Sequence, residues 1–334
     1  MLVVIGVIAI LISLLLPALG KARAQAQSVA CLANLRTLGQ AMVMYTSQSR
    51  GWLLGSANTT GAPLWDDAGL RPGITPSNSP EVVDVSDYMG PLIRTMKLNM
   101  PDLDSLDSVK RFQRYREIAV FQCPSYRGAI QSEFTASGAG AGQAISYNSA
   151  LAFLLRPFRG SAYSGKSNMP GTPYWRAPAN YQPKITSIGQ TTQKIFLADG
   201  GKWSNGTSAP TFSITPGASH NDTPFADFGA FTGATKSYGR QVPNNIGSVP
   251  IDPRIFSYRH GIRKSRQATG SYRMNAVFYD GHAETMDDMQ SSNPTYWVPS
   301  GSQMDTAASI AAGQPQVYPD VVKFYNLPAT FIAP

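Results

Sequence analysis

The feature that most constrains this chain is an uncharged apolar run at its N-terminus. Residues 1–20 contain no acidic or basic side chain, and the first charges are Lys21 and Arg23. As a helix, Met1–Leu19 would extend about 28 Å at ~1.5 Å per residue, close to the thickness of a bilayer core. The run therefore predicts a transmembrane helix over residues 1–19.

Two other interpretations of this run stay open. A buried helix of a soluble protein rarely lacks every charge over such a length. A cleaved secretory signal carries its basic residues before the apolar core, whereas here the basic pair follows it.

The helical pattern continues beyond the apolar run. Residues 21–38 contain neither proline nor any glycine, and Gly51 follows as a plausible stop. Apolar residues spaced three or four apart form one stripe, as in a one-sided helix: Leu32, Leu35, Leu38, Met42 and Tyr45. We therefore expect one long helix over residues 1–49, with a kink at Pro17, because proline removes a backbone hydrogen bond.

The remaining residues, 50–334, predict a globular head. The chain has 30 Gly, 25 Pro and only 14% charged residues, which favours a turn-rich, strand-containing head. Asp280-Gly281 lies between two of the expected strands and is a strong hairpin signal. The expected strands are Ala119–Gln122, Ile145–Phe153, Lys194–Ala198, Arg273–Tyr279, His282–Met286 and Val321–Tyr325, with a further helix at Leu103–Tyr115 and loops at 55–91, 136–143 and 200–250. The predicted fold class is α+β, with the amphipathic half of the first helix packed on a mainly antiparallel sheet.

The segment LVVIGVIAILISLLLPAL resembles the N-terminus of type IV pilins and type II secretion pseudopilins. Pro17 matches the helix-bending proline of that family. The leader peptide, phenylalanine and glutamate that precede this segment in the family are absent here. The resemblance therefore implies an upstream basic leader, cut by a prepilin peptidase, and a sequence begun at an internal methionine.

A second resemblance covers more of the chain. The stretches CLANLRTLGQAMVMYTSQSRGWL, FQCPSY, SYNSAL and RHGIRKSRQATGSYRMNAVFYDGHAE are similar to pilin-like proteins with a C-terminal H-X9-DG processing-associated motif. His260, Asp280 and Gly281 match the residue types of that motif. Their spacing departs from it, because residues 261–279 separate the histidine from the aspartate.

The resemblance implies a pilin-like fold and a structural role rather than catalysis. The expected protein is a subunit of a type IV pilus-like or type II secretion pseudopilus-like filament. Its implied partners are identical or related subunits, the inner membrane and a prepilin peptidase. The head would be extracytoplasmic, and the assembled filament periplasmic or extracellular. The alternative is a membrane-tethered surface enzyme or carbohydrate-binding protein that uses the helix only as an anchor.

The residues themselves give no clear catalytic, cofactor or metal motif. His260 and His282 flank Asp280 in sequence, so a small metal site is conceivable there, but no metal ligand or cofactor is assigned. The net charge of +8 and a basic cluster favour anionic neighbours, although nucleic acid is not the expected partner. The members of this basic cluster are Arg254, Arg259, Arg263, Lys264, Arg266 and Arg273. Several tryptophans could stack on sugars or pack in the core: Trp65, Trp175, Trp203 and Trp297.

The two cysteines, Cys31 and Cys123, allow one intramolecular disulfide. An exported location is oxidising, which favours a bond between the helix and the head. Two separate buried thiols remain the alternative, since sequence does not show that the Cα atoms approach within ~7 Å.

Overall fold

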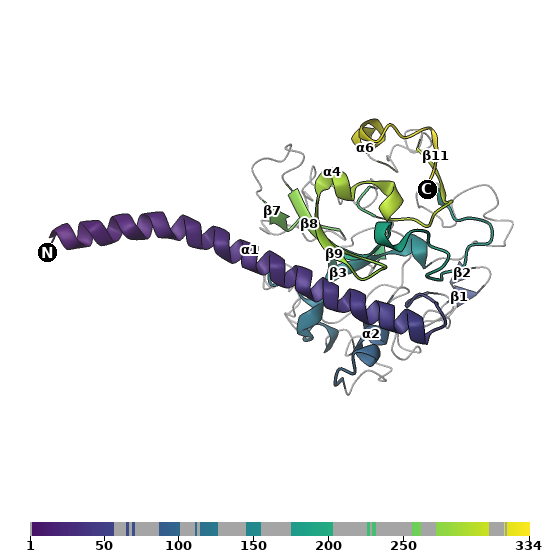
Figure 1. Cartoon of the computed structure of the whole chain (residues 1–334), viewed down its shortest axis with the longest axis horizontal. Coiled ribbons are helices and arrows are strands. Elements are labelled where there is room, and N and C mark those ends of the chain that lie inside the picture. The colour runs from purple at the N-terminus through teal and green to yellow at the C-terminus, as the bar shows by residue number, and fades with distance from the viewer. Residues whose placement is uncertain are drawn as a thin grey trace, which may run out of the picture.

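A computed structural model describes residues 2–56, 65–66, 69–70, 87–100, 111, 114–125, 145–154, 175–202, 226–227, 229–231, 256–261, 272–306, 317 and 319–334. Helix α1, Leu2–Gln48, is its longest element. The first half of α1 extends away from the head as a free rod, and the second half lies against the head (Figure 1). The helix stays continuous through Pro17, and its ribbon curves over the extended half. The predicted long N-terminal helix is thus confirmed.

Helix α1 ends where the sequence predicts. Gly51 has a φ of 82°, and its N–H donates to the carbonyl of Thr46 at 2.7 Å. Glycine adopts this left-handed conformation without steric penalty, so the turn satisfies a carbonyl left open at the helix end.

The head is organised around a six-stranded sheet. The strand order is β6-β3-β5-β8-β7, and β9 also pairs with β8. All pairs are antiparallel except that of β3 with β6, which is parallel. The strand bounds are β3 Ile145–Ala150, β5 Ile195–Lys202, β6 Ala226–Asp227, β7 His260–Gly261, β8 Tyr272–Phe278 and β9 Ala283–Asp287. The α+β class with a mainly antiparallel sheet agrees with the sequence-based expectation.

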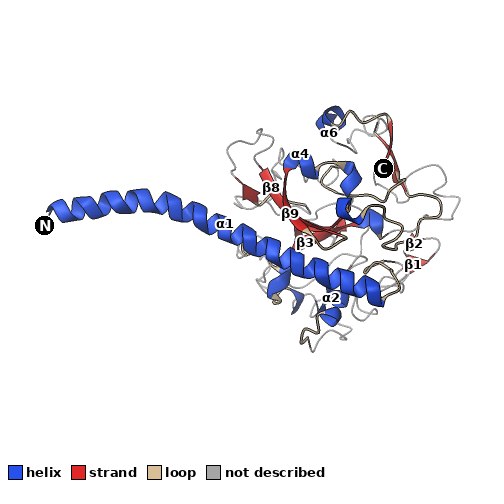
Figure 2. Cartoon of the chain, viewed as in Figure 1, coloured by secondary structure: helices blue, strands red, loops and turns tan. Residues whose placement is uncertain are grey.

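The smaller elements surround this sheet (Figure 2). A three-stranded sheet has the order β11-β10-β4, and β1 pairs with β2 in a two-stranded sheet. Their strands are β1 Trp65–Asp66, β2 Gly69–Leu70, β4 Trp175–Arg176, β10 Gln303–Asp305 and β11 Thr330–Ile332. The short helices are α2 Met89–Thr95, α4 Asp288–Ser291 and α6 Pro319–Phe324, and the 3₁₀ turns are η2 Ala119–Phe121, η3 Leu151–Phe153, η5 Thr191–Gln193 and η6 Pro294–Tyr296.

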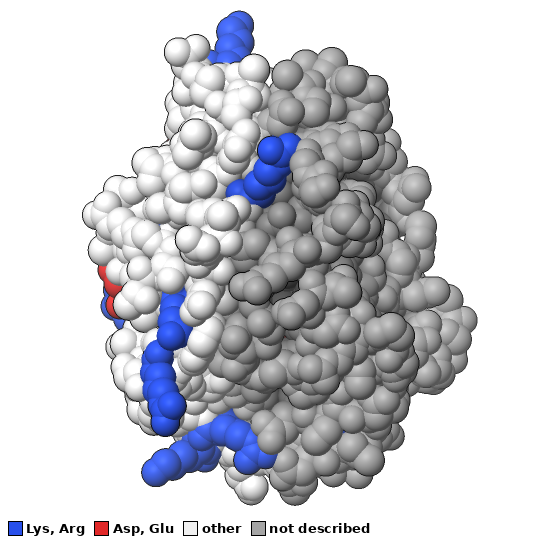
Figure 3. Space-filling view, turned by 90° about the vertical axis from the view of Figure 1, so that its right-hand side faces the viewer, with Lys and Arg blue, Asp and Glu red and all other residues white. Residues whose placement is uncertain are grey.

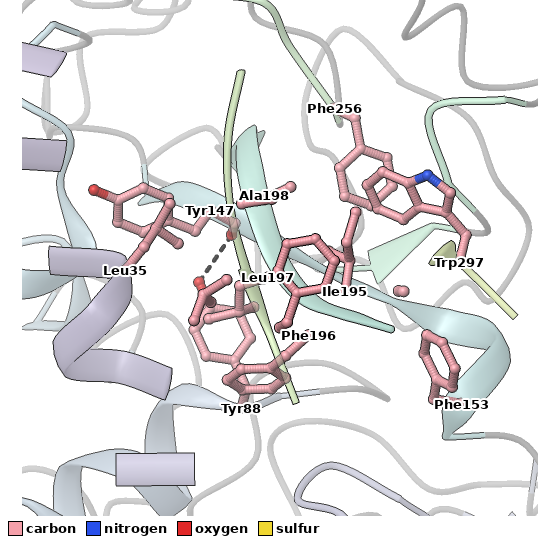
Figure 4. Packing of buried hydrophobic residues seen from close by; sticks show 14 of the residues in the cluster. Leu35, Tyr88, Tyr147, Phe153, Ile195, Phe196, Leu197, Ala198, Phe256 and Trp297 are labelled. Carbon is pink, nitrogen blue, oxygen red and sulfur yellow. Dashed lines mark hydrogen bonds between the residues drawn. The ribbon is translucent and has the colours of Figure 1, made fainter. Parts of the chain in front are cut away.

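The core lies between α1, α2 and the large sheet and is rich in aromatic rings. Tyr88 packs edge-on against Phe121 and Phe196, with ring centroids 6.1 and 6.3 Å away. Its hydroxyl donates to the carbonyl of Tyr147 at 2.8 Å, which satisfies a polar group inside the apolar cluster (Figure 4).

The hairpin predicted at Asp280-Gly281 is present between β8 and β9. The Gly281 N–H donates to the Phe278 carbonyl at 2.9 Å, and the Phe278 N–H donates to the His282 carbonyl at 2.9 Å. Gly281 has a φ of 89°, the conformation that a tight hairpin turn requires of a glycine.

Two predicted strands are wrong. Ala119–Gln122 forms the 3₁₀ turn η2, because the Asn34 side chain of α1 donates to the Gln122 carbonyl at 2.8 Å and binds this segment to the helix rather than to a strand. Val321–Tyr325 lies largely in helix α6, which has Pro319 and Asp320 in its first turn and Lys323 in its last. That arrangement favours a helix over a strand.

The other sequence expectations are met in part. Ile145–Phe153 divides into β3 and the turn η3. The predicted helix Leu103–Tyr115 and the predicted loop 136–143 lie largely or wholly outside the described residues. The predicted loop 55–91 contains β1, β2 and the start of α2, and the predicted loop 200–250 contains the end of β5 and β6, so neither is loop throughout.

Candidate functional site: the N-terminal helix and its attachment to the head

The first half of α1 carries an apolar surface with no protein packed on it. Every side chain from Val3 to Ala26 is exposed. The exposed fraction is 78% for Val3, 70% for Leu14 and 67% for Leu19. Among the described residues, α1 is the one helix long and apolar enough to cross a membrane. A contiguous apolar surface of this kind marks a membrane or protein contact.

The second half of α1 is buried along the predicted stripe. Leu35, Leu38 and Met42 are fully buried against the head. Leu32 and Tyr45, at the ends of the stripe, are half-buried, and Arg36, Thr37 and Gln40 are exposed, as the pattern requires. The first half of α1 is therefore apolar on all sides and contacts no other part of the described structure, whereas the second half is amphipathic and packs on the head.

A glycine lets α1 lie directly on the β8–β9 hairpin. A Cβ atom on Gly39 would lie 3.2 Å from the Gly281 Cα and would overlap the Val277 side chain. A residue with a side chain does not fit at this approach, because the opposing atoms are backbone and a stiff β-branched side chain. The DG turn of the sequence motif thus contacts α1.

Three polar side chains fasten α1 where it enters the head. Asn275 donates to the Ser28 carbonyl at 3.1 Å, and Tyr147 donates to the Cys31 carbonyl at 3.3 Å. The third is the bond from Asn34 to the carbonyl of Gln122. Burial raises the pKa of the Tyr147 hydroxyl, and the nearby Asp199 carboxylate raises it further, so this hydroxyl stays protonated and remains a donor.

A disulfide joins α1 to the head at the same level. Cys31 and Cys123 are bonded, with Cα atoms 4.8 Å apart, and both are fully buried. This is the pairing that the sequence favoured over two separate thiols. Cys123 follows the 3₁₀ turn η2 and not a strand, so that part of its predicted setting was wrong.

An imidazole and a carboxylate lie next to the disulfide. The His260 Nε2 atom lies 3.9 Å from Cys123 Sγ and 3.1 Å from Asp199 Oδ2. The same carboxylate oxygen accepts the backbone N–H of Asn275 at 2.7 Å. The His260 side chain is 4% exposed and that of Asp199 is 0% exposed, so this group does not face a substrate from solution.

Asp199 occupies a break in the sheet. The β5–β8 pairing extends to Ala198 opposite Ala276, and the β7–β8 pairing begins with His260 opposite Arg273. Between these two ladders the Asp199 carboxylate replaces a backbone acceptor for the Asn275 N–H. Sequence reasoning missed this residue. Its signal is a charged side chain within the otherwise apolar strand IFLADGG.

The structure separates His260 from Asp280 and His282, the three residues at which the sequence allowed a small metal site without assigning one. In the β7–β8 ladder, His260 lies opposite Arg273 at the start of β8, whereas Asp280 comes after the end of β8. Seven residues of extended chain place them roughly 20 Å apart. Asp280 instead pairs with His282, whose Nδ1 lies 2.6 Å from its carboxylate on the surface. The His and DG parts of the motif therefore have different surroundings, one beside the disulfide and one beneath α1.

Two members of the predicted basic cluster, Arg259 and Arg273, lie in the described part of the structure. Arg259 donates to the Ser146 carbonyl at 2.9 Å, and Arg273 lies 3.8 Å from the Asp287 carboxylate. The other four members, Arg254, Arg263, Lys264 and Arg266, lie outside the described residues. In the described part of the face in Figure 3, lysines and arginines lie in several separate groups.

Of the four tryptophans considered for sugar stacking, Trp297 has a clear role in the structure. Trp297 is fully buried, its indole N–H donates to the Ser291 carbonyl at 2.6 Å, and its ring packs against Phe256 with centroids 4.6 Å apart. It serves the core rather than a sugar-stacking surface. The side chains of Trp65, Trp175 and Trp203 lie outside the described part of the structure.

No known protein family, curated protein or solved structure matches the chain.

Proposed function

We propose that this protein is a structural subunit of a pilin-like or pseudopilin-like filament, anchored in the inner membrane by α1 before assembly. The head would lie on the extracytoplasmic side and would coat the filament afterwards. The observation that carries the proposal is the division of α1 at about residue 27 into a free apolar half and a half locked to the head.

The apolar half suits two environments in turn. In a bilayer, lipid would surround its exposed side chains, and the helix satisfies its own backbone hydrogen bonds. In a filament, the same half of neighbouring subunits would replace the lipid through close side-chain packing. Because residues 1–20 carry no charge, the transfer between these environments buries no ionised side chain.

The attachment of α1 suits the transmission of force from helix to head. The disulfide and the three polar side chains join α1 to the head between residues 28 and 34. The Gly39–Gly281 approach adds a tight contact further along the helix. Pulling on the apolar half would therefore move the head without first bending a loop.

The rival function is a tethered surface enzyme or carbohydrate-binding protein. Both functions need an anchor, but only a filament subunit needs this particular apolar surface. Replacing residues 2–24 with an unrelated transmembrane helix of equal length separates them. Membrane fractionation reports anchoring, and electron microscopy of sheared cell-surface material reports filaments.

The filament proposal expects the replaced chain to fractionate with the membrane and to lose its filaments. The matched control is a chain with one conservative change in the same half, Leu14→Ile, which should keep both properties. The proposal would be contradicted if filaments persisted after the replacement. It would also be contradicted if the unaltered chain, expressed with its assembly genes, formed no filaments.

A further inference from the structure

We propose that, when the Cys31–Cys123 disulfide is reduced, the two thiolates bind one zinc ion together with His260 and Asp199. The site would join α1 to β5 and β7 through a metal in place of the sulfur–sulfur bond. Its chemistry does not depend on whether the chain forms filaments.

The ligand atoms already lie close together. The Sγ atoms of Cys31 and Cys123 and one ring nitrogen of His260 all lie within 4.8 Å of one another. These residues come from α1, from the segment after η2 and from β7, so the cluster depends on the fold and not on a sequence motif. Two cysteines and a histidine are common ligands of tetrahedral zinc.

The distances around His260 Nε2 fit tetrahedral coordination. Bond lengths of about 2.05 Å to nitrogen, 2.3 Å to sulfur and 2.0 Å to oxygen imply ligand separations of about 3.6 Å for N···S and 3.3 Å for N···O. The structure has 3.9 Å to Cys123 Sγ and 3.1 Å to Asp199 Oδ2. After reduction the sulfurs must separate to about 3.8 Å, which side-chain rotation allows.

Asp199 supplies an independent indication of a ligand. Its Oδ1 atom is buried and has no hydrogen-bond partner among the described residues. A buried carboxylate that leaves one oxygen without a partner is costly, and a metal ion bound beside it would offset its negative charge. The other oxygen, Oδ2, accepts the Asn275 N–H and lies 3.1 Å from the His260 Nε2, so Oδ2 is the oxygen placed to coordinate the metal.

The steps balance without an unnamed reactant. A phosphine reductant breaks the S–S bond, takes one oxygen from water to become the phosphine oxide, and leaves two thiols. Zinc then replaces the two thiol protons, which pass to solvent. His260 binds as the neutral imidazole through Nε2, and Asp199 binds as the carboxylate. Oxidation to the disulfide would release the metal, because a sulfur bonded to the other sulfur is no longer a thiolate that can coordinate zinc.

The test uses the full chain in detergent, reduced with a phosphine, stripped of metal with a chelator and titrated with Co²⁺. Tetrahedral Co²⁺ bound to thiolates gives a charge-transfer band in the near ultraviolet and intense d–d bands in the visible. We expect one Co²⁺ per reduced chain with this spectrum, its displacement by Zn²⁺, and no such spectrum from the oxidised chain. Removing a direct ligand, as in His260→Gln, should weaken binding by more than about 100-fold, beyond the usual effect of an outer-shell partner.

The matched control is His282→Gln, which removes an exposed histidine that also pairs with an aspartate, and it should bind as the parent does. Circular dichroism follows folding in each sample. If the reduced chain unfolds without metal, recovery of the fold on adding Zn²⁺ supports the proposal, and failure to recover overturns it. A folded reduced chain that binds no Co²⁺, or binds it octahedrally or equally well in His260→Gln, also overturns it.

Discussion

Gly39 on helix α1 and Gly281 in the β8–β9 turn meet so closely that a Cβ atom on Gly39 would lie 3.2 Å from the Gly281 Cα. This approach lets the packed half of α1 lie on the hairpin. The two glycines allow this contact for different reasons. Gly39 has no side chain to collide with the hairpin, and Gly281 adopts the positive φ that the turn requires.

Gly39→Val should destabilise the attachment of α1. The new side chain would overlap Val277, which is fully buried and stiff at χ1, so overpacking outweighs the small gain in helix propensity. We expect the free energy of unfolding to fall by about 2 kcal/mol in denaturant titrations. Gly20→Val is the control, because a Cβ at Gly20 meets nothing within 4 Å and should leave the value unchanged. If Gly39→Val and Gly20→Val changed the free energy of unfolding equally, the contact between Gly39 and Gly281 would not be a tight one.

Gly281→Ala should destabilise through the backbone alone. The nearest atom to the new Cβ would be the Val43 Cγ2 at 3.6 Å, an ordinary contact, whereas the φ of 89° is strained for alanine. We expect the free energy of unfolding, measured by thermal or chemical denaturation, to fall by about 1–2 kcal/mol. Gly281→Asn should cost less, since asparagine tolerates the left-handed region better. If alanine and asparagine proved equally harmless, the positive φ would not be required.

The disulfide should contribute strongly to stability. It closes a sequence separation of 92 residues, and on the chain-entropy model its loss costs about 4–5 kcal/mol. We expect Cys31→Ser combined with Cys123→Ser to lower the free energy of unfolding by that order in the presence of a chelator. Thiol labelling of the denatured, unreduced parent should find no reactive thiol. Two reactive thiols would contradict the bond.

Lys194 should make stability rise with pH above about 8. It is a buried lysine whose Nζ donates to the Thr295 carbonyl at 2.8 Å, and burial lowers its pKa to about 8. Its pKa in the unfolded chain is near 10.4, so the unfolded state holds the proton more tightly and folding gains as that proton is lost. Burial raises the pKa of Tyr88 and Tyr279, so ionisation of tyrosine in the unfolded chain reverses the trend above about pH 10.

The measurement is chemical unfolding of the parent and of Lys194→Met between pH 7.5 and about 9.5. The parent should gain stability relative to the variant as pH rises through this window. A constant difference would show that the folded lysine keeps an ordinary pKa.

Much of the architecture could be predicted because it depends on local periodicity. The spacing of Leu35, Leu38 and Met42 fixes the buried face of α1, and Asp280-Gly281 fixes the hairpin turn. The wrong strands show the limit of local propensity. The contact with Asn34 turns Ala119–Gln122 into η2, and neither periodicity nor composition shows that contact.

The surroundings of the disulfide were harder to predict. His260 was identified from a sequence motif, but its neighbours Asp199 and Cys123 are far away in sequence and meet only when three elements pack. The partner expected from the motif, Asp280, lies at the opposite end of β8. Long-range pairing of this kind carries no signal in the spacing of one sequence.

The most direct test of the filament account is photo-crosslinking from the free half of α1. A photoreactive amino acid at Leu14, which is 70% exposed, is activated in cells that express the chain with its assembly machinery. The account predicts a ladder of crosslinked products at multiples of the 35.9 kDa chain. The ladder should be absent when assembly is blocked and much weaker with the probe at the exposed head residue Lys323. Crosslinks to lipid alone, with or without assembly, would contradict the filament and leave α1 as a simple membrane anchor.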